Sequence, residues 1–277
     1  MRNVLRVVVP AMALLGLGCP GEPAALVPRL EAPDWQDGET AVYEVRRNDS
    51  ALFVSRQVLR FDEELLPGYG PVPTALLTTT VEPALSRQFF YDSTTVVFRR
   101  DTILPLRSFR SLETDIGLFD VETRYEPGSA EIRRQSIEGI DERRLSTRGP
   151  VYDNEMMGTV LRAIPLDPGT RLKVQAVVAI DLRVMPLEVA VLGTKSIATP
   201  LGDIICREVE VTSPAKRVRF WYELEQPRRL VGLADQESGT ELMLVDWTAG
   251  GADELSGELP PAPGAGVRRV ARVPVPR

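Results

Sequence analysis

From Glu39 to Trp247 the chain alternates apolar and polar residues with a period of two. In the clearest run, the apolar positions are Leu172, Val174, Ala176, Val178, Ile180 and Leu182. Successive side chains of a strand point to opposite faces of a sheet, so this alternation is typical of half-buried antiparallel strands. Turn pairs such as Pro127-Gly128 and Ser238-Gly239 separate the runs at hairpin spacing. We therefore predict an all-β fold, mainly antiparallel, in which roughly a dozen strands form a strongly curved meander sheet or half-barrel.

One segment departs from this period. Residues 153–164 read DNEMMGTVLRAI, and their apolar positions recur at helical spacing. Asp153 or Asn154 can cap the start of a helix, and Pro165 ends it. We predict one amphipathic helix over Asp153–Ile164, packed on the concave side of the sheet with Arg162 turned away from the apolar stripe.

The predicted strand Arg217–Leu224 presents an apolar face to match that stripe, with Val218, Phe220, Tyr222 and Leu224 in alternation. We expect a shared apolar cluster formed by Met156, Met157, Val160, Leu161, Phe220 and Tyr222. Two roles remain open for these residues. They either fill a packed core or line an adaptable groove for an apolar ligand.

The 277-residue chain contains no histidine. Histidine is the commonest general base and the commonest metal ligand. Its absence excludes Ser-His-Asp and Cys-His nucleophilic catalysis and the usual zinc and iron sites. We therefore predict a protein that is not an enzyme and assign no catalytic, cofactor or metal residue. A carboxylate-dependent hydrolase is the distant alternative, because it needs only two acidic groups in one cleft.

The net charge is −6, so we expect no nucleic-acid partner. The two cysteines are Cys19 and Cys206. Cys206 follows Ile204 and Ile205 in an apolar run, which predicts a buried structural thiol.

The first residues, MRNVLRVVVPAMALLGLGC, are similar to a bacterial lipoprotein signal. A cationic start precedes an apolar run, Val7–Leu17, that is too short to span a membrane. We predict a signal peptide over residues 1–18 and lipidation of Cys19, which would place the protein in the bacterial envelope with its N-terminal lipid in a membrane. Pro20, rather than Asp, follows the cysteine and favours the outer membrane. Ordinary secretory cleavage near Ala24 and Ala25 is the alternative.

Composition divides the rest of the chain into three parts. Residues 19–38 are rich in Pro, Glu and Ala and are predicted to form a tether. Residues 39–248 are predicted to form a single antiparallel β domain. Residues 249–277 lack aromatic side chains and are dominated by Gly, Pro and Ala, which predicts a disordered tail.

An ordered set of short motifs resembles the bacterial exported family named domain of unknown function 3108. The motifs are the G-E-x-x-x-Y-E-V run at Gly38–Val45, the stretch Asp101–Phe109, the turn Leu161–Gly169, the hairpin Thr199–Cys206 and the aromatic pair Phe220-Trp221. The resemblance implies a strongly curved antiparallel sheet similar to the lipoprotein carriers LolA and LolB. It implies no catalytic residues.

Two functions follow from a curved sheet with one helix. If the concavity is open, the protein is a non-catalytic, lipid-anchored envelope protein that binds a lipid or acyl chain there. If side chains fill the concavity, it is an envelope scaffold or protein-interaction module that acts through its surface and loops.

Overall fold

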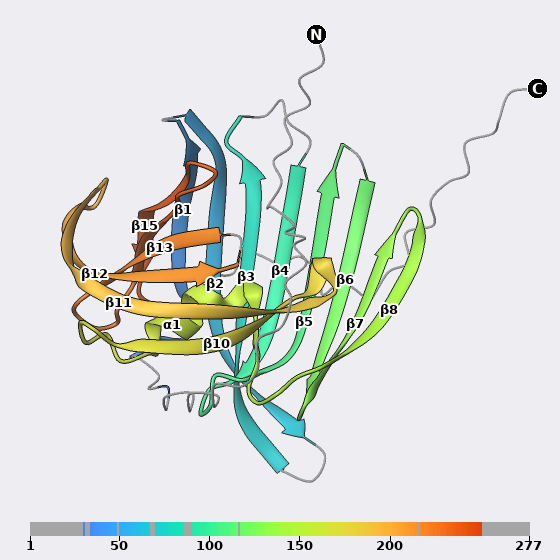
Figure 1. Ribbon diagram of the computed structural model, residues 1–277. Helices are drawn as coiled ribbons and strands as arrows, with labels where there is room; N and C mark the ends of the chain where they lie inside the picture. The colour runs from blue at the N-terminus through green and yellow to red at the C-terminus, as the bar shows by residue number, and fades with distance from the viewer. Residues whose placement is uncertain are drawn as a thin grey trace, which may run out of the picture.

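Over the residues that the structure describes, a 15-stranded sheet curls around one short helix (Figure 1). The computed structural model describes residues 30, 34–48, 50–66, 70–85, 90–115, 117–214 and 216–250. The strands are β1 (Glu39–Arg47), β2 (Ser50–Leu66), β3 (Gly70–Pro83), β4 (Phe90–Arg99), β5 (Pro105–Thr114), β6 (Gly117–Glu126), β7 (Ser129–Ser136), β8 (Gly139–Ser146), β9 (Tyr152–Asp153), β10 (Arg171–Val178), β11 (Arg183–Thr199), β12 (Gly202–Ser213), β13 (Lys216–Glu223), β14 (Leu230–Asp235) and β15 (Thr240–Thr248). The predicted all-β fold is confirmed, with more strands than expected.

Two meanders make up the sheet. Strands β1 to β8 pair antiparallel in chain order and form one wing, while β10 to β15 pair antiparallel in chain order and form the other. The wings join where β1 pairs with β15, with Ala41 opposite Trp247 and Val45 opposite Leu242. The first and last strands along the chain, β1 and β15, therefore lie side by side near the centre of the sheet.

The two edges of the sheet differ. Strand β8 is one edge and is exposed along nearly its whole length. Strand β9 is the other edge, has only two residues, and pairs parallel to β10. The β9 edge curls inward until it touches β5, while the helical turn that follows it touches β4. The sheet is therefore a half-barrel, strongly curved and not closed.

The helix lies inside this curve. A 3-10 turn, η1 (Asn154–Met156), leads into α1 (Met157–Arg162), and the Asp153 carboxylate accepts a hydrogen bond from the Glu155 backbone N–H at the start. In Figure 1, β10 and β11 cross on one side of α1 and the strands β2 to β4 pass on the other. The predicted helix is confirmed, although regular α-helix covers only Met157–Arg162.

Three predicted details are wrong. The alternating run that begins at Leu172 ends as a strand at Val178, because a second 3-10 turn, η2 (Ala179–Asp181), follows with Leu182 in a left-handed conformation. Leu224 lies beyond β13 and is 39% exposed, because a bulge at Trp221/Tyr222 and the turn after Glu223 take the chain off the sheet. Arg162 is buried, as described below.

The packed part of the chain starts before β1. Trp35 is buried against Phe98 with their rings 5.8 Å apart and nearly perpendicular, and Leu30 also packs against the core. Asp37 accepts a hydrogen bond from the Phe61 backbone N–H at 2.8 Å. Leu30, Trp35 and Asp37 lie within the range for which composition predicts a tether, and these three residues contact the sheet.

Candidate functional site

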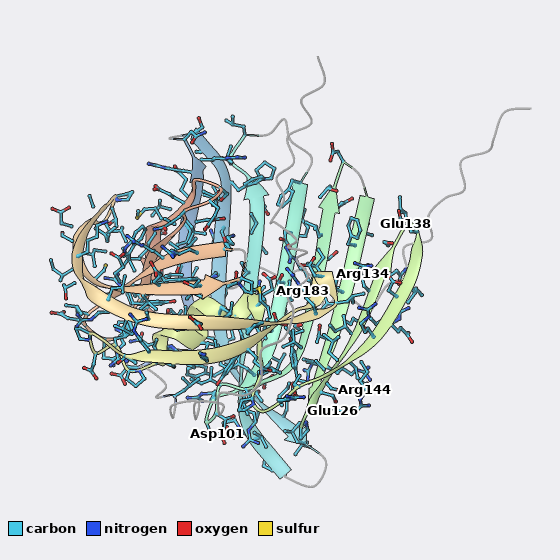
Figure 2. All side chains as sticks on the ribbon, in the orientation of Figure 1. Asp101, Glu126, Arg134, Glu138, Arg144 and Arg183 are labelled. Atoms are coloured by element: carbon cyan, nitrogen blue, oxygen red, sulfur yellow. The ribbon has the colours of Figure 1, made fainter. Side chains whose placement is uncertain are left out.

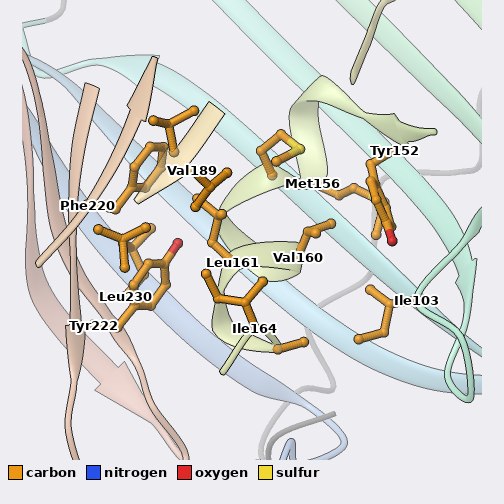
Figure 3. Close-up of a cluster of buried hydrophobic side chains, with 14 of the residues drawn as sticks. Ile103, Tyr152, Met156, Val160, Leu161, Ile164, Val189, Phe220, Tyr222 and Leu230 are labelled. Atoms are coloured by element: carbon orange, nitrogen blue, oxygen red, sulfur yellow. The ribbon is translucent and has the colours of Figure 1, made fainter. Parts of the chain in front are cut away.

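The six residues predicted to share an apolar cluster meet inside the concavity. Met156, Met157, Val160 and Leu161 come from the helical segment, and Phe220 and Tyr222 come from β13. Met156, Val160, Leu161 and Tyr222 have no exposed surface. Figure 3 shows the helical side chains projecting between β13 on one side and Ile103 on the other. The Tyr222 hydroxyl donates to the Gly158 carbonyl at 2.9 Å, which ties the helix to the strand.

A buried ion pair holds the C-terminal end of α1. Arg162 donates from Nη1 and Nη2 to the two carboxylate oxygens of Glu39 at 2.7 and 3.2 Å. Nη2 also donates to the Pro227 carbonyl at 2.9 Å. Both charged side chains are less than 10% exposed. The prediction that Arg162 points away from the core is therefore wrong, because its partner on β1 lies 123 residues earlier in the chain.

A second charged cluster holds the N-terminal end. Arg110 on β5 forms a two-pronged pair with Asp92 on β4, at 3.0 and 2.6 Å, and donates to Glu155 of η1 at 2.9 Å. The Tyr125 hydroxyl on β6 donates to Asp153 at 2.6 Å. These contacts pin the β9 edge to the concave face of β4, β5 and β6. We call the five residues the seam cluster.

Burial shapes the acidity of the seam cluster. It raises the pKa of Asp153 above its ordinary value, and the negative charge of Glu155 raises it further. Burial also raises the pKa of Asp92, although the hydrogen bond from Arg110 opposes this. Three carboxylates therefore share one guanidinium and one phenol in a region where unpaired charge is costly. Arg110 holds Asp92 and Glu155, and Tyr125 holds Asp153, where the β9 edge meets β4, β5 and β6. These three carboxylates therefore do not form the open acidic cleft that a carboxylate-dependent hydrolase needs.

The space left beside the helix is small. A cavity of about 20 Å³ lies between α1, β1, β2 and β3, lined by Tyr43, Gln57, Leu77, Thr159 and Arg162 among others. This volume is close to that of a single water molecule. Where the helix packs, the concavity is filled by side chains.

A larger hollow lies further along the same wing, toward the β8 edge. It measures about 420 Å³ and runs over β6, β7 and β8. Its lining residues are Glu122, Arg124, Glu131, Ile132, Arg133, Glu142, Arg143 and Arg144. Arg144 bridges Glu131 at 2.6 Å and Glu126 at 3.0 Å, and Figure 2 shows Glu126 and Arg144 close together at one end of these strands. The hollow is charged and solvent-facing, so it is not the apolar pocket that the ligand-binding alternative requires.

Cys206 lies in a separate small core. It packs with Ile197, Trp221 and Val231 and has no exposed surface. Burial raises the pKa of the Cys206 thiol to about 12. Since the thiolate is the reactive form, this environment makes the thiol inert at neutral pH. Cys19, the predicted lipidation site, lies outside the described residues.

Among the described residues, no group of three or more Cys, Asp or Glu side chains is arranged to hold a metal ion. In the same part of the chain, no helix has the length and apolar character needed to cross a membrane.

A family model described as protein of unknown function DUF3108 matches residues 68–237, which is more than half of the chain. The chain belongs to the DUF3108 family. Four of the motifs on which the resemblance was based lie inside the matched range, from Asp101–Phe109 to Phe220-Trp221. The family description of DUF3108 assigns no activity, and no curated protein matches the chain.

Three solved structures are similar to this DUF3108 protein over most of its length. A beta-barrel-like protein of the DUF1849 family from Brucella abortus has 12% identity and a TM-score of 0.47, covering 77% of this chain and 98% of its own. A presumed exported protein with a YmcC-like fold from Bacteroides fragilis has 10% identity and a TM-score of 0.36, covering 79% and 99%. A presumed lipoprotein from Parabacteroides distasonis has 11% identity and a TM-score of 0.30, with the same coverage. These similarities concern the course of the chain alone.

Proposed function

We propose that this DUF3108 protein is a non-catalytic envelope protein that acts through its surface as a scaffold or protein-interaction module. The observation that carries the proposal is the filled concavity. Met156, Val160 and Leu161 fill the inside of the curve, and the cavity of about 20 Å³ beside the helix is close to the volume of a single water molecule.

The anchoring of the helix supports a permanent plug. Its two ends are held by Arg162 with Glu39 of β1 and by Arg110 of β5 with Glu155. Withdrawal of the helix would separate the buried charges of Arg162 and Glu39, and an unpaired buried charge costs several kcal/mol. We therefore expect the helix to remain in place as part of the folded core and not to open as a lid.

The apolar cluster formed by the helix and β13 inside the curve favours one second candidate, because its side chains would face an acyl chain once the helix moved away. In this candidate the helix is a releasable lid and the concavity binds a lipid or acyl chain after the helix leaves. Organic extraction of the purified protein followed by mass spectrometry separates the two. The plug proposal predicts no stoichiometric acyl lipid, whereas one acyl lipid per chain would contradict it and establish the lid.

We also propose that Cys19 is lipidated and that the protein is anchored in the envelope, with the outer membrane favoured. The support is the short apolar run before the cysteine and the helix-breaking residues after it. Phase partitioning in detergent of the wild type and of Cys19→Ala tests the anchor. We expect the wild type in the detergent phase and the variant in the aqueous phase, and equal release of both would refute lipidation.

A further inference from the structure

The free edge of β8 has a charge order that matches a reversed copy of itself. Its central residues are Asp141, Glu142, Arg143 and Arg144, two acids followed by two bases. An antiparallel copy of this strand can therefore place an acid of one chain opposite a base of the other. We propose that β8 is a homodimer interface, in which the β8 strands of two copies pair antiparallel and join two sheets into one.

Strand β8 is available for such pairing. It is the last strand of the sheet, and among the described residues its backbone pairs only with β7. Its eight residues are exposed except for the half-buried Leu145. An edge strand carries a row of backbone N–H and C=O groups without strand partners, which is a template for another strand. The opposite edge, β9, offers no such template because it is short and buried against the seam cluster.

The faces of β8 restrict the register of the pair. Leu145 packs into the concave-side cluster with Val121 and Ile132, so Asp141 and Arg143 share that face. Glu142 and Arg144 lie on the opposite face. Directly opposed residues of an antiparallel pair lie on one face of the sheet, so odd-numbered residues of one copy can face only odd-numbered residues of the other.

One register uses a charge that the single chain leaves unpaired. Arg143 has no carboxylate partner among the described residues, whereas Asp141 already accepts from Arg134 at 2.5 Å. If Glu142 lies on the two-fold axis opposite its own copy, Asp141 of each chain faces Arg143 of the other. Two symmetric ion pairs then form on the concave face.

The same register brings the Glu142 carboxylates of the two copies together, which opposes pairing. Each of them keeps its ion pair with Arg133 at 3.5 Å, and Arg144 of the other copy lies at the diagonal position on the same face. The like charges at the axis are therefore surrounded by four guanidinium groups. An interface of one eight-residue strand is small, and we expect a weak, concentration-dependent dimer.

Charge exchange tests the interface. Sedimentation equilibrium of Cys19→Ala, over a concentration series, gives the reference dimer dissociation constant without the predicted lipid. Arg143→Asp and Asp141→Arg each put like charges opposite each other twice and should weaken the dimer by about tenfold. The double variant restores both ion pairs in reverse and should recover the reference value to within about threefold. Arg56→Asp, on an exposed position of the interior strand β2, is the matched control and should change nothing.

Cysteine substitution tests the register. In the Cys19→Ala background, Glu142→Cys lies opposite its own copy and should form an intermolecular disulfide under mild oxidation, whereas Arg144→Cys should not. Thermal melting shows that each variant is folded, which is expected because β8 is exposed. A reference protein that is monomeric at every concentration overturns the proposal. So does a dimer that survives both single charge reversals, because it would use another surface.

Discussion

The guanidinium of Arg162 and the carboxylate of Glu39 form a two-pronged ion pair inside the protein, at 2.7 and 3.2 Å, across 123 residues of chain. Glu39 is the first residue of β1 and Arg162 the last of α1, so the pair fixes the helix to the centre of the sheet. Removal of one partner of such a buried pair leaves the other charge uncompensated.

We therefore expect Arg162→Ala to lower the free energy of unfolding by about 3–5 kcal/mol. Chemical denaturation measures this change. The matched control is Arg133→Ala, whose ion pair with Glu142 is solvent-exposed and should contribute no more than about 1 kcal/mol. Equal losses in the two variants would show that the Arg162 pair contributes little to stability.

Substitution of Leu161 tests whether the helix is a fixed part of the core inside the concavity. Leu161→Ala removes a side chain with no exposed surface and should cost about 2–5 kcal/mol, while Leu161→Asp should unfold the domain or cost more. Leu201→Asp, in an exposed turn, is the control and should have little effect. If Leu161→Ala leaves the melting temperature unchanged, the helix is not part of the folding core.

The seam cluster predicts a pH dependence. Burial, and then the charge of Glu155, raises the pKa of Asp153 above its value in the unfolded chain. The native state therefore binds the proton more tightly, and the contribution of Asp153 to stability falls as the pH rises from the ordinary carboxyl pKa through the raised one. Asp153→Asn removes this titration, so the stability of the wild type relative to the variant should decline as the pH rises above the ordinary carboxyl pKa of about 4.

Unfolding by urea at several pH values measures that difference. Asp101→Asn serves as the control of opposite sign, because the hydrogen bond from Arg99 lowers the pKa of Asp101. The Asp101 contribution is present at neutral pH and is lost as the pH falls through the lowered pKa. If the free energy of unfolding of the wild type, relative to that of Asp153→Asn, increases with rising pH, the predicted direction is wrong.

The thiol of Cys206 should react very slowly with thiol reagents in the folded protein. Its thiol has no exposed surface and a pKa of about 12, so maleimide labelling at neutral pH should proceed only through unfolding. In a Cys19→Ala background, Ile205→Cys with Cys206→Ala places a thiol at a position whose native side chain is 51% exposed and should label quickly. Cys206→Ala alone should cost about 1–2 kcal/mol from lost apolar burial. Labelling of Cys206 as fast as that of the exposed thiol would mean that this small core opens readily.

The sequence predicts the local elements well, because their signals are local. The alternation at Leu172, Val174 and Ala176 appears in β10 with all three buried, and the helical spacing from Met156 to Leu161 appears in η1 and α1. Arg162 could not be placed correctly, since a charged residue beside an apolar stripe points to solvent unless a distant partner such as Glu39 is known. The seam cluster depends on how far the sheet curls, which no short pattern records.

The position of β1 has a mechanical consequence. The chain enters the sheet through β1, an interior strand with β2 on one side and β15 on the other. A pull along β1 from its N-terminal side loads two ladders of backbone hydrogen bonds in shear, whereas an edge strand would peel from one neighbour a bond at a time. A force applied to the N-terminal side of β1 is therefore resisted by more backbone hydrogen bonds at once than a force applied to an edge strand.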